Sequence, residues 1–250
     1  MTDYTRDRAK TVLQKSGLFP IARTAYRVCS RGVRKQRAHE ISFYSSLIPP
    51  GALCFDIGAN LGQKTEVLLA CGAHVVSVEP NPLCYPTLRH LFGKNKNCNI
   101  VPSAVGKTNG CIDLYIHGTD ATGSVRPEWD KQIYGFDRGA TAVKTPLTTL
   151  DALIELYGKP DFINIDVEGF EVDVLSGLSS SIPLLSFEYH SAEIVRTEEC
   201  LKILSRLGRL LIRASDEECN WLGPRTDDVQ GCLQRLHGTS VKGDLLVWMS

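Results

Sequence analysis

The feature that most constrains the fold is an alternation of short apolar runs with segments of helical periodicity, from residue 53 to residue 207. Alternation of this kind predicts βαβ units, whose right-handed crossovers give a parallel sheet with helices on both faces. We expect strands at 53–58, 74–80, 99–102, 161–166, 184–190, 209–215 and 243–250, and helices at 63–70, 86–92, 149–157, 170–178 and 192–207. The fold class is therefore α/β, with about seven strands in a mostly parallel sheet.

The last two expected strands, 209–215 and 243–250, follow each other without an obvious helix between them. A connection that lacks a crossover helix favours an antiparallel hairpin at the sheet edge. We therefore expect the last strand to be antiparallel.

An insertion at about 107–147 interrupts the alternation. Residues 111–118 alternate like a half-exposed strand, and the polar stretch that follows carries Trp129, Tyr134 and Phe136. A long polar segment with aromatic residues is typical of a loop that covers a pocket. A surface insertion without such a role is the alternative.

The first 49 residues form a basic, helical segment, and the core domain is expected at 50–250, after the break at Pro49-Pro50-Gly51. Residues 1–37 contain ten Lys or Arg against two Asp, although the whole chain has no net charge. Arg23, Arg27 and Arg31 share one helix face. They form either a solvated face or a surface that attracts an anionic membrane or an acidic substrate.

The composition is that of an ordinary soluble protein, with 43% hydrophobic and 22% charged residues in a chain of 250. No apolar run approaches the roughly 18 residues that span a bilayer, and the polar N-terminus lacks the apolar stretch of a secretory signal. The nine cysteines contain no CxxC pair, which favours free thiols in a reducing compartment. We therefore expect the protein in the cytoplasm.

The loop DIGANLG, residues 56–62, follows the first expected strand and leads into a helix. Gly58 and Gly62 permit close backbone approach, Asn60 tolerates left-handed dihedral angles, and a helix N-terminus favours anionic ligand groups. Glu79 ends the second strand, where its carboxylate can accept hydrogen bonds from both hydroxyls of a ribose. The loop lacks the GxGxxG pattern of dinucleotide-binding proteins.

The D-x-G-x-N-x-G loop resembles motif I of the class I S-adenosylmethionine-dependent methyltransferases. Together with VEPNP (78–82), SAVG (103–106), IDVEGFE (165–171) and FEYH (187–190), it resembles the FkbM family over about residues 50–190. The resemblance implies a Rossmann-like class I methyltransferase fold and S-adenosylmethionine as cofactor. It also implies methyl transfer to a hydroxyl of a sugar, glycolipid or natural product. The family often has a lysine where this chain has Asn164.

The expected cofactor-binding residues lie at the carboxyl ends of the first, second and fourth core strands and in the segment after the third. They are Asp56, Gly58, Asn60, Gly62, Glu79, Pro80, Asn81, Ser103, Ala104 and Asp166. The segments around Pro80 and Ser103 fall where the class I fold lines the adenine.

The candidate catalytic residues are Asp166, Glu188 and His190. Glu188 and His190 are two residues apart on one strand, so they share a face, and a histidine near carboxylates is a candidate general base. The same groups could instead hold a magnesium or manganese ion, although their spacing matches no metal motif. Glu168 and Glu171 could simply complement the dipole of the helix that they begin.

Three other functions are weighed against methyl transfer to oxygen. A nicotinamide-dependent oxidoreductase is opposed by the missing GxGxxG pattern, and a non-catalytic nucleoside-binding module by the acidic groups and histidine at the strand ends. EPNPLCY (79–85) superficially resembles the motif of amino-group methyltransferases but follows the second strand rather than the fourth. Nucleic-acid acceptors are therefore disfavoured.

Overall fold

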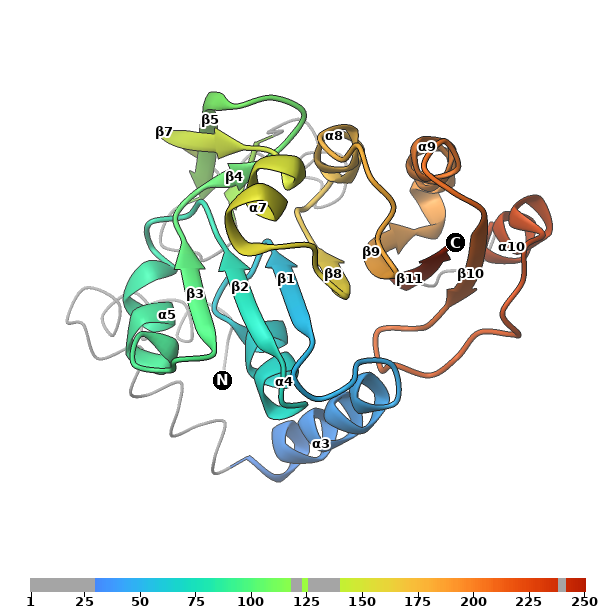
Figure 1. Cartoon of the computed structure of the whole chain (residues 1–250), viewed down its shortest axis with the longest axis horizontal. Coiled ribbons are helices and arrows are strands. Elements are labelled where there is room, and N and C mark those ends of the chain that lie inside the picture. Colours follow the sequence, from blue (N-terminus) through green and yellow to red (C-terminus); the bar gives the residue numbers. More distant parts are fainter. Residues whose placement is uncertain (1–29, 118–122, 126–139, 238–241) are drawn as a thin grey trace, which may run out of the picture.

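A computed structural model describes residues 30–117, 123–125, 140–237 and 242–250. The main sheet consists of β1 (Leu53–Ile57), β2 (His74–Val78), β3 (Cys98–Val101), β8 (Phe162–Ile165), β9 (Leu184–His190), β10 (Leu210–Ala214) and β11 (Lys242–Met249). Their order is β10-β11-β9-β8-β1-β2-β3 (Figure 1). Only β11 runs antiparallel to its neighbours, β9 and β10. The predicted α/β class, seven-stranded sheet and reversed last strand are confirmed.

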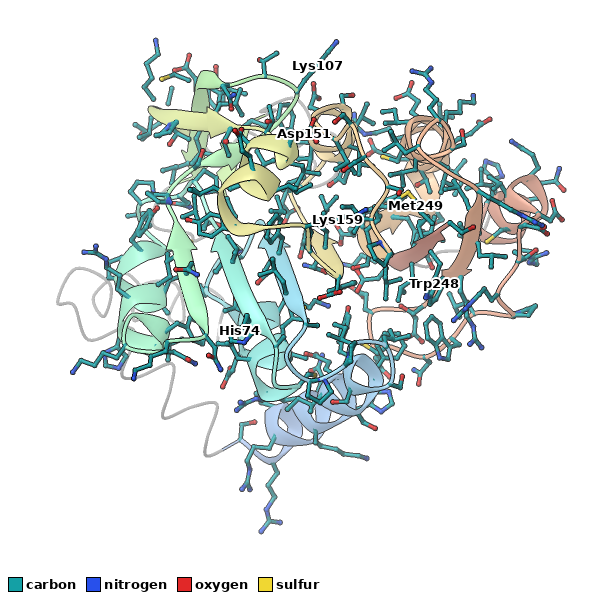
Figure 2. All side chains as sticks on the ribbon, viewed as in Figure 1. His74, Lys107, Asp151, Lys159, Trp248 and Met249 are labelled. Atoms are coloured by element: carbon teal, nitrogen blue, oxygen red, sulfur yellow. The ribbon has the colours of Figure 1, made fainter. Side chains whose placement is uncertain are left out.

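Helices cover both faces of this sheet (Figure 1). They are α3 (Arg31–Ser45), α4 (Gln63–Ala70), α5 (Tyr85–Phe92), α7 (Leu150–Tyr157), α8 (Glu171–Ser176), α9 (Ile194–Leu204) and α10 (Val229–Leu236), with a short 3₁₀ turn at Ser191–Glu193. Helices α3 and α4 share one apolar cluster with alternate strand residues, and α7 to α10 share another with the remaining ones. Figure 2 shows this alternation at the consecutive residues Trp248 and Met249, which belong to opposite faces.

The expectation that no helix separates the last two strands is wrong, because α10 lies between β10 and β11. The Asp228 side chain caps this helix by accepting a hydrogen bond from the Gly231 amide at 2.9 Å. Cys232, Leu233 and Leu236 then form its buried face. Eight residues that include a glycine are too few to show helical periodicity clearly in the sequence.

The insertion and the residues just before it form a second sheet, of which only a half-exposed strand at 111–118 was expected. Its strands are β4 (Ala104–Val105), β5 (Gly110–His117), β6 (Gly123–Ser124) and β7 (Ala140–Thr148), in the order β4-β7-β5-β6. Strand β5 pairs antiparallel with β7 over eight residues, a long-range pairing that local sequence patterns do not reveal. Trp129, Tyr134 and Phe136 lie outside the described residues.

Helix α3 packs onto the core face formed with α4, where Tyr44 is completely buried and Phe43 is 8% exposed. The Arg37 guanidinium pairs with the Glu66 carboxylate of α4 at 2.8 Å. Arg31 lies on the exposed side of α3, whereas Arg23 and Arg27 lie outside the described residues. In the part of the chain that the structure describes, no helix combines the length and apolar character needed to cross a membrane.

Candidate active site

A chain of buried hydrogen bonds crosses the sheet beneath the loop at 56–62. Asp56, Asn164 and Ser186 are neighbours in register on β1, β8 and β9. The Asp56 carboxylate accepts hydrogen bonds from the Thr65 hydroxyl (2.5 Å) and the Asn164 amide (3.1 Å), and Ser186 donates to Asn164 at 3.1 Å. Burial raises the pKa of Asp56, although these hydrogen bonds oppose the shift. Asp56 therefore anchors the loop and the start of α4.

The loop itself lies in left-handed backbone conformations, with φ angles of +84° at Gly58, +50° at Asn60 and +79° at Gly62. The expectation that Asn60 tolerates this region is confirmed. A Cβ atom at Gly58 would come within 1.8 Å of the Asp166 carbonyl oxygen, and one at Gly62 within 2.4 Å of the Phe92 ring. Glycine at both positions thus lets the loop pack against its neighbours.

Glu79 follows β2 and holds the loop from the opposite side. Its two carboxylate oxygens accept hydrogen bonds from the backbone amides of Asn60 (2.6 Å) and Asn81 (2.7 Å). The residue is 5% exposed, and burial raises the pKa of its carboxyl to about 7. Each oxygen has a further lone pair, so the carboxylate can still accept the two ribose hydroxyls proposed from the sequence.

Beside Glu79 lies a narrow cavity, which we call the Glu79 cavity. Its lining consists of Ile57, Gly58, Asn60, Val78, Glu79, Pro80, Ser103, Ala104, Val105, Leu114, Val125, Asp166, Val167, Glu168 and Phe170. Seven of the ten residues expected to bind the cofactor are among them. Leu114 of β5 and Val125, which directly follows β6, contribute to the wall, so part of the insertion does border the cavity.

The other three expected cofactor residues are not part of this lining. Asp56 is occupied by the buried hydrogen bonds, and Gly62 packs on Phe92. The Asn81 side chain accepts a hydrogen bond from the Leu83 amide at 2.9 Å, which shapes the turn before α5. These residues support the loop and the adjoining turn.

A second and wider cavity, of about 530 Å³, joins the first; we call it the Lys64 cavity. It is lined by Val33, Gln36, Arg37, Glu40, Asp56, Gly58, Ala59, Asn60, Gln63, Lys64, Asn164, Asp166, Glu188, Glu217, Gly243 and Asp244. Gly58, Asn60 and Asp166 line both cavities and so mark their junction.

Asp166 and Glu188 face this second cavity from the ends of neighbouring strands, β8 and β9. Burial raises the pKa of both carboxyls, and repulsion from nearby carboxylates, Glu168 for Asp166 and Asp166 for Glu188, raises it further. Asp166 has exposed surface within the cavity. The pair can therefore hold a proton near neutral pH.

His190 lines neither the Glu79 cavity nor the Lys64 cavity. It lies in a small cavity with Glu193 and Arg196, which Glu188 also lines. Burial and the neighbouring charge of Lys242 lower the pKa of His190, so the imidazole is neutral at pH 7. The structure therefore brings Asp166 together with Glu188, and places His190 behind Glu188.

The turn that carries Asp166 is held at Gly169. The Gly169 amide donates to the Glu171 carboxylate at 3.0 Å, and the Arg196 guanidinium donates to the Gly169 carbonyl. Glu168 adopts a φ of +52°, which is rare for a side chain of this size. Glu171 is thus more than the helix-dipole partner considered from the sequence, since its side chain fixes the turn.

Comparison with known proteins identifies the family. The Methyltransferase FkbM domain matches residues 56–211, more than half of the chain. The chain belongs to the FkbM methyltransferase family. This membership confirms the resemblance seen in the sequence, and it favours methyl transfer over nicotinamide-dependent oxidation. The fold is accordingly the Rossmann-like fold of the class I methyltransferases.

One curated relative of this FkbM protein is the hexuronic acid methyltransferase AglP of Haloferax volcanii. The two are 24% identical over 185 residues, which cover 70% of this chain and 71% of the relative. Among solved structures, precorrin-6Y C5,15-methyltransferase from Geobacter metallireducens GS-15 is 11% identical, with a TM-score of 0.44 and coverage of 89% and 90%. The cofactor-bound Rv0187 from MTB is also 11% identical, with a TM-score of 0.45 and coverage of 88% and 82%.

Sequence reasoning missed a polar cluster that joins three elements of this FkbM protein. Lys64 of α4 donates to the Tyr44 hydroxyl of α3 at 2.7 Å, and that hydroxyl donates to Asp244 of β11 at 3.0 Å. Lys64 also pairs with Asp244 at 3.3 Å. Tyr44 and Asp244 are 200 positions apart, and no local pattern connects them.

The described residues contain no group of three or more His, Cys, Asp or Glu side chains arranged to hold a metal ion.

Proposed function

We propose that this FkbM methyltransferase transfers the methyl group of S-adenosylmethionine to a hydroxyl oxygen of a sugar, glycolipid or natural product. The observation that carries the proposal is the meeting of two cavities at Gly58 and Asp166. One cavity has the groups that suit a nucleoside, and the other offers carboxylates to a second molecule. Transfer between two bound molecules requires such a junction, because proximity and alignment supply much of the rate.

The residues around the Glu79 cavity fit the cofactor. The Glu79 carboxylate would accept the ribose hydroxyls, and Pro80, Ser103 and Ala104 would border the base. When bound, S-adenosylmethionine supplies a methyl group on a positively charged sulfur. The carboxylates around the junction favour such a cation electrostatically.

Loss of the acceptor proton is assigned to the carboxyl pair. Glu188 and Asp166 face the Lys64 cavity, and their raised pKa values make the ionised forms stronger bases than an ordinary carboxylate. His190 shares the small cavity with Glu188, so we assign it a positioning role on that side chain. A positioned base of this kind contributes about 10²–10⁴-fold to the rate.

The acceptor class has support from two directions. Carboxylate oxygens are pure hydrogen-bond acceptors, so they suit a molecule that presents hydroxyl donors. The relative from Haloferax volcanii is described as acting on a hexuronic acid, which is a sugar derivative. A nucleic-acid acceptor remains disfavoured on the sequence grounds given above.

Isothermal calorimetry and a transfer assay test the proposal. S-Adenosylmethionine and S-adenosylhomocysteine should bind, whereas NAD should not. With S-adenosylmethionine carrying a labelled methyl group, label should enter the carbohydrate or glycolipid fraction of a host extract and resist base treatment that cleaves methyl esters. Binding of NAD instead, or label found only in nucleic acid or protein, would contradict the proposal.

A further inference from the structure

The two cavities differ in how they relate to the family. Every residue that lines the Glu79 cavity falls within residues 56–211, the part that matches the FkbM domain. The Lys64 cavity is walled partly by residues 33–40 of α3, by Glu217, and by residues 243–244 of β11, all outside that part. The donor side is thus built from the matched domain, whereas the second cavity also depends on segments outside it.

These segments are held firmly against the shared domain. Tyr44, Lys64 and Asp244 tie α3, α4 and β11 together through one buried hydroxyl. The pairing of Arg37 with Glu66 adds a second link between α3 and α4. The cavity of about 530 Å³ lies within the range of roughly 300–1,000 Å³ for small-molecule sites. A wall fixed in this way can discriminate between acceptors.

The charges on the wall indicate which acceptor fits. Among the described lining residues, the cations are Arg37 and Lys64. Arg37 pairs with Glu66 through one terminal nitrogen of its guanidinium, while its buried Nε has no hydrogen-bond partner among the described residues, and Lys64 pairs with Asp244. The lining carboxyl groups are Glu40, Asp56, Asp166, Glu188, Glu217 and Asp244. An acceptor carboxylate would therefore lie among several carboxyl groups and compete with Glu66 and Asp244 for the two cations, whereas hydroxyl groups would meet hydrogen-bond acceptors.

We propose that the Lys64 cavity is the acceptor site and that it selects an uncharged polyhydroxyl molecule over one that carries a carboxylate. This rests on the proposed function. It separates the present chain from its relative named for hexuronic acid. The specificity-determining residues are Gln36 and Glu40 of α3, which line the cavity without belonging to the carboxyl pair.

Saturation-transfer NMR on the full chain, with S-adenosylhomocysteine present, tests this with two matched probes. Methyl α-D-glucopyranoside and methyl α-D-glucopyranosiduronate differ only by a carboxylate in place of a hydroxymethyl group. The neutral probe should bind at least about tenfold more tightly, a difference of about 1.4 kcal/mol. Gln36→Trp, which fills the cavity, should abolish this binding, and Glu40→Lys should narrow the preference or reverse it.

Val195→Trp, at a 65% exposed position on α9 that lines none of the three cavities described above, is the control and should leave the binding of both probes unchanged. Equal or tighter binding of the glucuronide, no binding of the neutral probe, or insensitivity to Gln36→Trp would each overturn the inference. A failure of the proposed function would be distinguishable from a failure of this inference. In that case S-adenosylhomocysteine would not bind in calorimetry, irrespective of whether either sugar probe binds.

Discussion

At the residue scale, Glu79 has two functions that share one carboxylate. It fixes the loop through the amides of Asn60 and Asn81, and it faces the cavity assigned to the cofactor. Burial raises the pKa of this carboxyl to about 7. Hydroxyl donors stabilise the ionised form, so ligand binding and loss of the proton are linked.

Glu79→Ala should weaken the binding of S-adenosylmethionine by about 1.5–3 kcal/mol, the range for hydrogen bonds to a charged group. In the unmodified protein, affinity should rise about tenfold from about pH 6 to about pH 8, because the ligand binds the ionised carboxylate. Calorimetry at several pH values measures both effects. Glu79→Gln is the matched control, which should retain the fold and lose this part of the pH dependence. Unchanged affinity in a folded Glu79→Ala variant would refute the assignment.

The base assignment separates Glu188 from His190. Glu188→Gln should lower turnover by about 10²–10⁴-fold while binding of S-adenosylhomocysteine persists. Activity should increase with pH through the raised pKa of the carboxyl pair, since a base acts in its ionised form. His190→Asn should cause a smaller loss and leave that ascending limb in place.

The opposite result would show that His190, the residue suggested by the sequence, is the general base. In that case His190→Asn would lower turnover by roughly 10²-fold or more and remove an ascending limb near the ordinary imidazole pKa of about 6.5. Loss of activity with a chelator, and recovery with magnesium or manganese, would instead support the metal alternative.

At the element scale, α3 marks where the basic N-terminal segment becomes part of the fold. Its last turns bury Phe43 and Tyr44, whereas Arg31, Arg34 and Lys35 near its start are exposed. Removing residues 1–37 would cut this helix and damage the Lys64 cavity, which α3 lines. A deletion of residues 1–29 leaves the helix and its Ser30 cap intact.

The full chain should sediment with vesicles of anionic phospholipid at low salt and be released at about 0.5 M salt, where screening is nearly complete. The variant lacking residues 1–29 should bind less, because it loses six of the ten basic residues in the segment 1–37. Vesicles of neutral phospholipid are the control. Equal sedimentation of both proteins would favour the solvated-helix alternative, and an unchanged melting temperature would show that the deletion spares the fold.

At the scale of the whole molecule, the two cavities lie where the strand order changes direction. From β1 the chain builds the sheet outward through β2 and β3, and then continues on the other side of β1 with β8 and β9 (Figure 1). Ligand sites in open parallel sheets form in the crevice at this point, at the carboxyl ends of the strands. Gly58 directly follows β1 and Asp166 directly follows β8, so the two residues meet at the junction of the cavities.

The sequence alone determined the main sheet, the glycine loop and seven of the fifteen residues that line the Glu79 cavity. These depend on short-range patterns: apolar runs, strand-end carboxylates, and residues that accept left-handed backbone angles. Helix 63–70 and strand 184–190 were predicted with the bounds that the structure shows, because each is a short, uniform segment between clear breaks.

Only the tertiary structure decided which of these residues share a cavity. The period of two correctly indicated that Glu188 and His190 share a face of one strand. It did not indicate that His190 lines a different cavity from Asp166. The contacts of Tyr44, Lys64 and Asp244 join segments up to 200 positions apart. Bringing these segments together lowers the conformational entropy of the chain, and the packing of the surrounding core offsets this loss. Such contacts leave no local pattern, so the wall of the proposed acceptor site could not be foreseen from the sequence.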